Sequence, residues 1–460
     1  MVTRLTDSPV YAHLWATPEL ERLLGEQARW QRWLDVLVVL ARVQARAGVV
    51  PEASARVIAE AARVERIDWE LVAEQTRRTS HSTLGLIRGL RAVLPAGVRE
   101  HVYVGATVQD LTDTWFGLLM RDVGDLLQRD LLAVEDAALR LARVHRDTPM
   151  AGRTHGQPGA PVTFGLKAAS WADELRRHLD RIGQGRSRWA VGQLGGAVGA
   201  LAFHDVAGVD PVALRREFCA ELGLADPGIS WLTSRDRVAE FGWVLAAVCG
   251  TLARIGGEVV ELQRPEIGEL AEPTRPEAVG SITMPHKRNP EVGEHLDTLA
   301  RLARSSAGVL LEGTVALHER DGRGWKAEWA ALPEVCLLSG TAVHLAVELV
   351  TGLEVHPEAM RANLDRFGDR LASERVLGAL SVRIGKHAAQ ELLHELLAPT
   401  SGAPADAGDL AQRLAERGIA TEAEVREWAT RSPVRSAGAM VDAVLERAAA
   451  VRTAGEGTAP

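Results

Sequence analysis

Several kinds of residue are scarce in this 460-residue sequence, and each scarcity argues against particular classes of protein. Aromatic residues make up only 4% of the chain, which disfavours a fold built on sheets, because strands favour aromatic and β-branched residues. The three cysteines, Cys219, Cys249 and Cys336, show no metal-binding spacing and cannot all pair. The first residues lack the charged and apolar regions of a signal peptide. We therefore expect a reducing, cytoplasmic setting.

Long runs of basic residues and long runs of apolar residues are missing as well. The net charge is −8 and no long basic run is present, which argues against nucleic acid as a partner. No uncharged apolar run approaches the roughly 18 residues that a membrane helix needs, so we expect no membrane partner. The sequence has no internal repeat and no Gly-rich phosphate loop of the Walker or dinucleotide type. We expect neither a cofactor nor a metal.

Helix-forming residues dominate what is present. Ala, Leu, Arg and Val abound, a mixture that favours helices over strands. Apolar residues recur at helical spacing, which predicts long helices at about 18–48, 112–145, 162–182, 234–263, 290–313 and 328–353. The prediction is an all-α fold with an N-terminal helical domain at 1–104, a central long-helix bundle at 105–353 and a small C-terminal helical domain at 354–460. The bundle helices carry apolar residues on more than one face, so we expect bundles to associate.

Two polar segments precede long predicted helices. Gly105-Ala106-Thr107-Val108-Gln109-Asp110 offers side chains and free backbone N–H groups that suit a carboxylate, or it merely caps the following helix. Gly152-Arg153-Thr154-His155-Gly156-Gln157-Pro158 places one histidine among polar and glycine residues at a helix entry. His155 is a candidate proton shuttle, or a hydrogen-bonded histidine with a structural role.

Two further segments lie between long helices. The stretch from Ala278 to Asn289 combines glycine, hydroxyls, a lysine and an asparagine. Such loops are commonly just flexible, but Met284 and Pro285 would give this one a fixed packing point. Lys287 and Asn289 lie directly before the helix start at Pro290, which predicts an anion site. The charged segment His318-Glu319-Arg320-Asp321-Gly322-Arg323-Gly324-Trp325 is interpreted as structural, with substrate contact as the alternative.

In this order, the four segments resemble the fumarase/aspartase superfamily, which includes fumarase, aspartase, argininosuccinate lyase, adenylosuccinate lyase and 3-carboxy-cis,cis-muconate cycloisomerase. The stretch Ser281 to Asn289 resembles the superfamily signature. Within the superfamily, His318-Glu319-Arg320-Asp321 and Ala327-Glu328-Trp329 look most like the carboxymuconate cycloisomerase / adenylosuccinate lyase branch, and the cycloisomerases in particular. The nucleotide-handling serines of adenylosuccinate lyases are absent from Gly322 to Trp329, which disfavours a nucleotide substrate. Ile282 stands where the family usually has a second serine, which suggests a specialised member.

The resemblance implies a role for each motif residue. Ser281 matches the base that forms the carbanion, and Lys287 and Asn289 match the groups that hold the carboxylate gaining charge. His155 matches the general acid or its relay. Glu294 matches the carboxylate that orients this histidine from a neighbouring subunit. The implied catalytic set is Ser281, His155, Lys287 and Glu294, and the implied substrate-binding set is Thr107, Gln109, Arg153, Thr154, Met284 and Asn289. His81 matches a second histidine of adenylosuccinate lyases, but its surroundings differ.

The implied fold is a three-domain, fumarase/aspartase-like fold with a central long-helix bundle. The implied activity is carbon–heteroatom lyase chemistry, an anti β-elimination from a small C2-substituted succinate. The products would be fumarate and ammonia, nitrite or a small amine. The alternative is 3-carboxy-cis,cis-muconate cycloisomerisation; adenylosuccinate cleavage and a non-catalytic structural role are less favoured. The partners expected are a small dicarboxylate substrate and three further copies of the chain, in a homotetramer with shared active sites.

Overall fold

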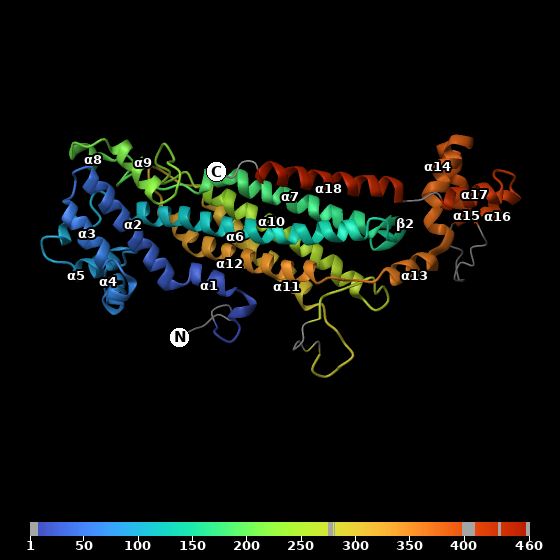
Figure 1. Cartoon of the computed structure of the whole chain (residues 1–460), viewed down its shortest axis with the longest axis horizontal. Coiled ribbons are helices and arrows are strands. Elements are labelled where there is room, and N and C mark those ends of the chain that lie inside the picture. The colour runs from blue at the N-terminus through green and yellow to red at the C-terminus, as the bar shows by residue number, and fades with distance from the viewer. Residues whose placement is uncertain (1–7, 275–278, 280, 398–409, 431–433, 457–460) are drawn as a thin grey trace. The chain divides into compact units, whose positions relative to one another are not determined.

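The structure is a computed structural model that describes residues 8–274, 279, 281–397, 410–430 and 434–456. Gly280, which opens the predicted signature, lies outside the described residues. The fold is helical, as predicted (Figure 1). Its α-helices are α1 (Pro18–Leu24), α2 (Glu26–Arg46), α3 (Glu52–Ala61), α4 (Trp69–Thr79), α5 (Leu84–Ala92), α6 (Val108–Val144), α7 (Phe164–Trp189), α8 (Ala202–Val206), α9 (Pro211–Glu221), α10 (Asp236–Gln263), α11 (Glu291–Glu312), α12 (Gly322–Thr351), α13 (Pro357–Phe367), α14 (Ser373–Ile384), α15 (Lys386–Leu397), α16 (Leu410–Glu416), α17 (Glu422–Thr430) and α18 (Val434–Glu456). Short 3-10 helices are η2 (Ala12–Leu14), η3 (Val64–Arg66), η4 (Arg99–His101) and η5 (Gly368–Ala372).

Strands in the described residues form two small antiparallel pairs. Strand β1 (Pro149–Thr154) pairs with β2 (Gln157–Thr163), and β3 (Leu270–Ala271) pairs with β4 (Glu354–Val355). The β1–β2 hairpin was not predicted: the sequence placed this segment in the loop that enters the next long helix. The structure instead has two strands, with α7 beginning at Phe164 directly after β2.

The long helices were predicted with errors at their ends. The predicted helix at about 18–48 is broken at Gly25, which separates α1 from α2. A Cβ on Gly25 would lie 2.6 Å from the carbonyl oxygen of Glu21, so this position tolerates only glycine without adjustment. Helix α12 begins at Gly322, earlier than predicted, and passes through Pro333 without ending.

The chain divides into two compact units, each of which draws on three stretches of sequence. Unit 1 comprises Met1–Leu131, His178–Ala253 and His295–Leu345. Unit 2 comprises Leu132–Arg177, Arg254–Glu294 and Ala346–Pro460. The predicted domain boundaries at 104/105 and 353/354 stay a prediction.

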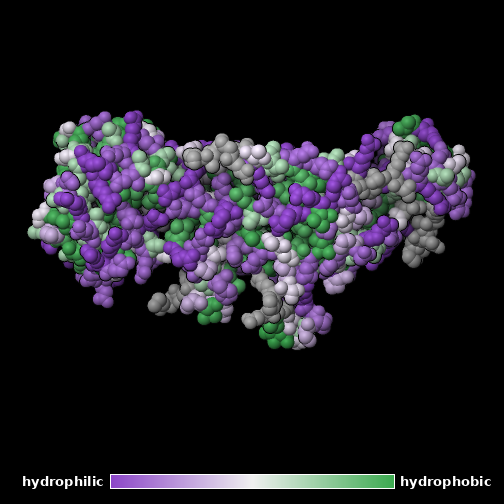
Figure 2. Space-filling model, in the orientation of Figure 1, coloured by the Kyte–Doolittle hydropathy of each residue, from purple (hydrophilic) through white to green (hydrophobic). Residues whose placement is uncertain are grey.

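In unit 1, α2 packs against α1, α3 and α9, and Figure 1 shows α2 to α5 gathered at the blue end of the chain. Tryptophan rings fill its interior. Trp33 is 2% exposed, and its ring contacts the rings of Trp30, Trp115 and Trp329. On the face drawn in Figure 2, hydrophilic side chains dominate the surface of this helix group. The large aromatic side chains of Trp33 and Trp115 therefore lie in the core of this unit rather than on its surface.

In unit 2, the described part of the C-terminal stretch builds a small core of its own. Helices α14 to α17 enclose Val376, Leu380 and Leu414, each with no exposed surface. Figure 1 shows these helices together at the orange-red end. Helix α13 packs on β1, which connects this region to the hairpin.

Helices α10 and α12 are long and apolar enough to cross a membrane by length and composition. Of the most apolar 18-residue window of each helix, 67% is buried inside the protein in α10 and 61% in α12. Burial on this scale is typical of core helices in a soluble protein. Both helices have one side facing the interior of the fold, so their apolar composition needs no lipid to explain it.

Candidate active site

The signature loop, defined here as Ser281–Asn289, follows α10 and β3 and leads into α11. The Ser281 Oγ accepts a hydrogen bond from the Met284 backbone N–H at 3.0 Å. The Lys287 N–H in turn donates to the Met284 carbonyl at 3.0 Å. These two bonds wind the loop into a turn that carries the serine and the lysine together.

The apolar side chains of the signature loop face solvent. Ile282 is 96% exposed and Met284 is 42% exposed, and Figure 2 shows hydrophobic surface at the end of this loop. The packing point predicted at Met284 is therefore absent. The loop is fixed through hydrogen bonds instead, because Met284 contributes both its N–H and its carbonyl oxygen to the turn.

Arg288 anchors the far end of the signature loop within unit 2. Its guanidinium donates to Glu354 of β4 at 2.8 and 3.2 Å and also to the Glu272 carbonyl. This pairing lowers the pKa of the Glu354 carboxyl. The Gln263 amide at the end of α10 donates to the Arg288 carbonyl at 3.2 Å. Lys287 and Asn289 are thus held on either side of a fixed residue.

The N-terminus of α11 is already capped. The buried Glu272 carboxylate accepts hydrogen bonds from the Val292 N–H at 3.1 Å and the Gly293 N–H at 2.7 Å. The positive pole of α11, which the sequence suggested for a bound anion, is occupied in this way. Glu294 follows on the exposed side of the first turn. Anion binding here falls to side chains rather than to the helix terminus.

A cavity of about 570 Å³ opens beside the signature loop in unit 2. Its lining includes Lys287, Asn289, Arg264, Arg288 and two histidines, and no carboxylate. Arg264 and Arg288 have acidic partners outside the lining. Among the described residues, none pairs with Lys287 in an ion pair. Within the described residues, the cavity therefore offers an ammonium group without an ion-pair partner to a negatively charged ligand. It also presents the Asn289 amide, whose nitrogen donates to Glu291 at 3.3 Å.

His155 lies at the tip of the β1–β2 hairpin. Thr154 pairs with Gln157, so His155 and Gly156 form a two-residue turn. Their φ angles are +52° and +75°, which is the backbone of the primed turns that close hairpins. Few residues other than glycine adopt this φ, and histidine is one of the more tolerant. The turn projects Thr154 and His155 into solvent.

Arg153 differs from the substrate-binding role that the resemblance implied. A β-bulge at Gly152/Arg153 shifts the register and re-aims the side chain. The guanidinium forms a two-pronged pair with Glu269 at 2.7 and 2.8 Å, and Glu269 has no exposed surface. The Asn363 amide of α13 donates to the same carboxylate at 2.8 Å. In this structure Arg153 fastens the hairpin to the rest of unit 2.

In unit 1, the first segment is a rigid loop at the start of α6. Gly105 has φ +68°, and a Cβ there would lie 2.6 Å from the His204 ring. The buried Asp110 carboxylate accepts hydrogen bonds from the N–H groups of Thr107 at 2.9 Å, Gly195 at 2.8 Å and Gly196 at 3.0 Å. Burial raises the pKa of Asp110 to about 7, although these bonds lower it. Asp110 thereby connects two loops.

The first and fourth segments meet at Thr107. The Arg320 guanidinium donates to Thr107 Oγ1 at 2.7 Å, and both residues reach the surface. Arg320 was outside the predicted site set, although its segment had been singled out. Tyr103 lies in the same region with φ +64°, and burial raises the pKa of its hydroxyl. The contact gives the fourth segment a second role besides structure: an exposed cation beside a predicted carboxylate ligand.

Gln109 and His81 are engaged within unit 1. Gln109 is fully buried, and its amide donates to Asp113 at 3.0 Å and to the Leu232 carbonyl at 2.6 Å. Neither N–H is left for a substrate carboxylate. The His81 Nδ1 accepts from the Leu84 N–H at 3.2 Å and so caps the start of α5. Nothing among the described contacts joins His81 to Thr107.

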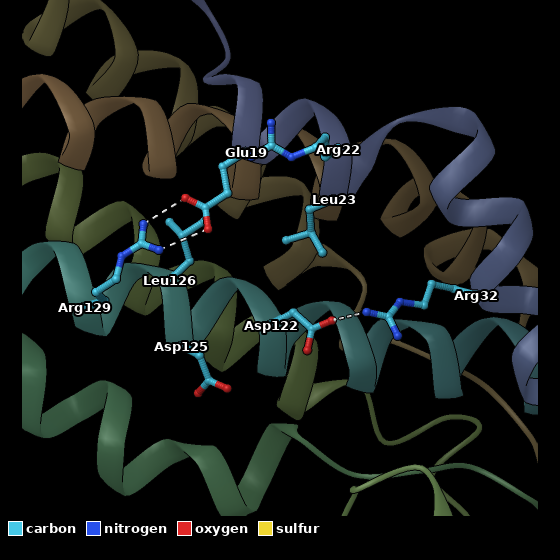
Figure 3. Close-up of a pocket in the computed structure, with 8 residues that line it drawn as sticks. All are labelled: Glu19, Arg22, Leu23, Arg32, Asp122, Asp125, Leu126 and Arg129. Atoms are coloured by element: carbon cyan, nitrogen blue, oxygen red, sulfur yellow. Dashed lines mark hydrogen bonds and ion pairs between the residues drawn. The ribbon is translucent and has the colours of Figure 1, made fainter.

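A second cavity, of about 610 Å³, lies in unit 1 between α1, α2 and α6 (Figure 3). Most of its charges are paired within the protein. Arg129 binds both carboxylate oxygens of Glu19, and Arg32 binds Asp122 at 3.1 Å. It contains none of the residues predicted from the motifs. Of the residues predicted from the motifs, Lys287 and Asn289 line the cavity beside the signature loop instead. The part of the chain that the structure describes holds no cluster of ligands suited to a metal.

In the described part of the chain, Ser281 and Lys287 share one tight turn, and His155 stands at the tip of a separate hairpin. The model of the family described as Lyase matches residues 15–303. The chain belongs to this family and, with it, to the fumarase/aspartase superfamily of enzymes.

Three similar proteins illustrate the range of the family. The chain is 37% identical to the N-acetyl-S-(2-succino)cysteine lyase of Dickeya dadantii, with 86% of each chain covered. It is 38% identical to the nitrosuccinate lyase of Streptomyces davaonensis, over 85% of this chain and 84% of the relative. The 3-carboxy-cis,cis-muconate lactonizing enzyme of Pseudomonas putida has a similar structure, with a TM-score of 0.84, 31% identity, and coverage of 95% of this chain and 98% of that one.

Proposed function

We propose that this enzyme catalyses anti β-elimination from a C2-substituted succinate, giving fumarate and a small leaving group. The observation that carries the proposal is the turn that holds Ser281 and Lys287 on either side of Met284. The substrate loses a proton from C3, the resulting charge spreads onto the neighbouring carboxylate, and the bond from C2 to the leaving group then breaks. The enzyme must supply a base, a partner for the dianion and, for poor leaving groups, an acid.

Ser281 is the proposed base. A free serine hydroxyl is too weak for this task and needs activation. Hydrogen bonds to the charged form lower a pKa, and nearby positive charge does the same. The Met284 N–H already points at Ser281 Oγ from 3.0 Å. Lys287 lies on the same turn, so both forms of alkoxide stabilisation come from one short segment.

Carboxylate recognition is assigned to two separate groups of residues. Lys287 and Asn289 line the cavity beside the signature loop and would hold the carboxylate that gains charge. In unit 1, Thr107, whose hydroxyl accepts a hydrogen bond from Arg320, would hold a carboxylate of the substrate. Arg320 adds a formal positive charge that the predicted set lacked. Thr154 stays in the proposed set because it is exposed on the same turn as His155.

His155 is the proposed acid or its relay. Its exposed position on a hairpin tip supports a role in reaching a ligand rather than in packing. Glu294, exposed on α11, is proposed to orient a histidine of another copy. We further propose a cytoplasmic homotetramer whose active sites draw residues from three chains.

The leaving group is the open part of the proposal. The sequence led us to expect ammonia, nitrite or a small amine. A relative named for nitrosuccinate supports nitrite, and a relative named for N-acetyl-S-(2-succino)cysteine adds a thiolate. Nitrite and thiolates depart as stabilised anions, whereas an amine must be protonated. Ile282, 96% exposed on the signature loop, presents an apolar side chain rather than a second hydroxyl.

Fumarate formation tests the proposal directly. Wild-type protein is mixed with nitrosuccinate, N-acetyl-S-(2-succino)cysteine, aspartate, 3-carboxymuconate and adenylosuccinate, and absorbance is followed near the fumarate band. We expect one of the first three to be turned over at least about a hundredfold faster than adenylosuccinate, because Gly322 to Trp329 contains none of the serines that would contact a nucleotide. Ser281→Ala serves as the blank for each substrate. Comparable rates with adenylosuccinate would refute the small-substrate assignment.

Cycloisomerisation of 3-carboxymuconate is the second candidate. The TM-score of 0.84 to the lactonizing enzyme favours it, together with the resemblance of the segment around Arg320. The reaction uses similar proton chemistry but closes a ring and releases no fumarate. Loss of the muconate absorbance without appearance of fumarate would identify it in the same assay.

A further inference from the structure

A buried cluster of charges lies at the start of three helices in unit 1. Arg235 is 2% exposed, and Asp113 and Glu328 have no exposed surface. The guanidinium binds Asp113 through two nitrogens at 2.7 and 3.1 Å. It binds Glu328 through Nε at 3.0 Å and through a second, shorter contact. The Trp231 ring covers it, with 5.0 Å from the guanidinium carbon to the ring centroid.

This cluster stabilises the helix packing less than its number of contacts suggests, because its charges are desolvated. Removing one cation and two carboxylates from water costs free energy, and apolar side chains of similar volume stabilise a core equally well or better. The cluster also leaves one negative charge in excess. Its fixed geometry is what an apolar core would not supply, since a planar guanidinium with two-pronged bonds defines the orientation of each partner.

The three charged residues belong to the three elements that frame the predicted carboxylate site. Asp113 lies one turn after Gln109 on α6, Arg235 directly precedes α10, and Glu328 lies on α12 eight residues after Arg320. The first and last of these elements meet at the Arg320–Thr107 hydrogen bond of 2.7 Å. The cluster therefore connects the two helices that begin just after the partners of that contact.

Gln109 depends on the same cluster. Its amide nitrogen donates to Asp113 Oδ2, which is also the oxygen that receives Arg235 Nη1. With the second N–H on the Leu232 carbonyl, the amide cannot flip without turning its oxygen toward two acceptors. Gln109 Oε1 has no hydrogen-bond partner among the described residues. Arg235 and Asp113 thus decide which way the amide of a predicted site residue faces.

We propose that Arg235, held between Asp113 and Glu328, is a positioning residue that aligns the starts of α6 and α12 and so sets the Thr107–Arg320 pair for binding a substrate carboxylate. The inference rests on the proposed function, because it takes Thr107 and Arg320 as carboxylate ligands. Its effect should appear in substrate binding rather than in the chemical steps assigned to Ser281 and His155.

Arg235→Lys keeps the charge but cannot bind both carboxylates with a planar fork. Arg215→Lys is the matched control. Arg215 is 5% exposed and binds Asp226 at 2.7 and 3.3 Å in the same unit, and none of its hydrogen bonds in the described chain reaches Thr107, Gln109 or Arg320. Both variants are compared with wild type in kcat, KM and thermal unfolding midpoint, with the substrate that the wild type turns over best.

We expect Arg235→Lys to raise KM at least about tenfold, with kcat lowered less than about threefold, while Arg215→Lys keeps both within about twofold. Glu328→Gln, which removes one buried charge and keeps the side-chain shape, should raise KM in the same direction and covers the case in which Arg235→Lys does not fold. A purely structural role would lower the unfolding midpoint and leave the KM of the folded enzyme unchanged, and that result would overturn the inference.

An equal rise in KM for Arg215→Lys would overturn it as well, because the effect would then belong to any buried arginine. Failure of the proposed function looks different. In that case wild-type protein itself turns over none of the substituted succinates, and the inference falls together with the assignment of Thr107 and Arg320.

Discussion

At the scale of single residues, the motif positions could be read from the sequence, but their contacts could not. Lys287 and His155 were singled out because an ammonium and an imidazole group stood before long helices, and Ser281 because the segment around it resembles the superfamily signature. Arg153 and Gln109 were grouped with them, yet the structure engages Arg153 with Glu269 and both Gln109 N–H groups with Asp113 and Leu232. Their partners lie far away in the sequence, so no local pattern could reveal that these donors were already taken.

The two proposed acid–base residues give a test of the leaving group. Ser281→Ala should fold normally, because a loop hydroxyl contributes little to stability, and should lose at least roughly three orders of magnitude in kcat. His155→Ala should be milder than Ser281→Ala if nitrite or a thiolate leaves, and comparably severe if an amine leaves, because only the amine needs a proton.

The measurement is kcat for both variants with the best substrate, beside Ser305→Ala as an exposed-serine control. A Ser281→Ala variant that keeps more than about a tenth of the wild-type rate would rule out Ser281 as the base.

Gly105 allows a second prediction at this scale. Its φ of +68° is strained for any residue with a Cβ, and that Cβ would lie 2.6 to 2.9 Å from the rings of Phe203 and His204. Gly105→Ala should therefore lower the free energy of unfolding by about 1–3 kcal/mol and raise KM, because Thr107 follows two residues later. Thermal unfolding and steady-state kinetics measure the two effects. Gly97 has no atom within 4 Å of a built Cβ, so Gly97→Ala should be nearly neutral; equal losses in both variants would contradict the packing argument.

At the scale of elements, long helices were predictable and short strands were not. Apolar spacing located α6, α7, α10 and α11 to within several residues, because a long amphipathic pattern repeats many times. The β1–β2 hairpin escaped because each strand is short and contains proline or glycine, and because a bulge interrupts its alternation. The break at Gly25 was missed for a related reason: a single glycine inside a helical pattern is usually tolerated.

The hairpin provides the prediction at this scale. Glu269 is fully buried and receives Arg153 and Asn363, so its removal leaves Arg153 without its counter-charge. Breaking a buried ion pair from one side costs about 3–5 kcal/mol, and 16% exposure of the Arg153 side chain places this case at the lower end. Glu269→Ala should lower the unfolding midpoint and speed amide hydrogen exchange in β1 and β2.

Glu266→Ala is the matched control for this change. Its side chain is 74% exposed and lies 3.9 Å from Arg264, and exposed ion pairs contribute little. Hydrogen exchange followed by mass spectrometry resolves the hairpin peptides. If exchange in β1 and β2 is unchanged in Glu269→Ala, Arg153 does not hold the hairpin in the way described.

At the scale of the whole molecule, apolar surface on the long helices points beyond a single chain. Within unit 1, Trp243 of α10 is 57% exposed and Leu311 of α11 is 64% exposed. Large exposed apolar residues on core-length helices are typical of surfaces that associate. Symmetric association of identical chains is the usual outcome for soluble oligomers. These exposed apolar residues agree with the homotetramer proposed above, in which each active site would draw on several copies.

Subunit mixing decides whether the sites are shared. His155→Ala and Ser281→Ala proteins are unfolded together in equal amounts and reassembled, and the activity is compared with that of each variant reassembled by itself. If a site takes His155 from one chain and Ser281 from another, each is intact with a chance of one half, so about a quarter of the wild-type activity should return. If both residues of a site come from one chain, every chain carries a defect and no activity returns.

Native mass spectrometry establishes that hybrid tetramers have formed. Ser281→Ala protein that is unfolded and reassembled by itself measures the background activity. Hybrid tetramers without recovered activity would mean that each chain builds its own site, and the proposed role of Glu294 toward the histidine of another copy would then fall with the shared site.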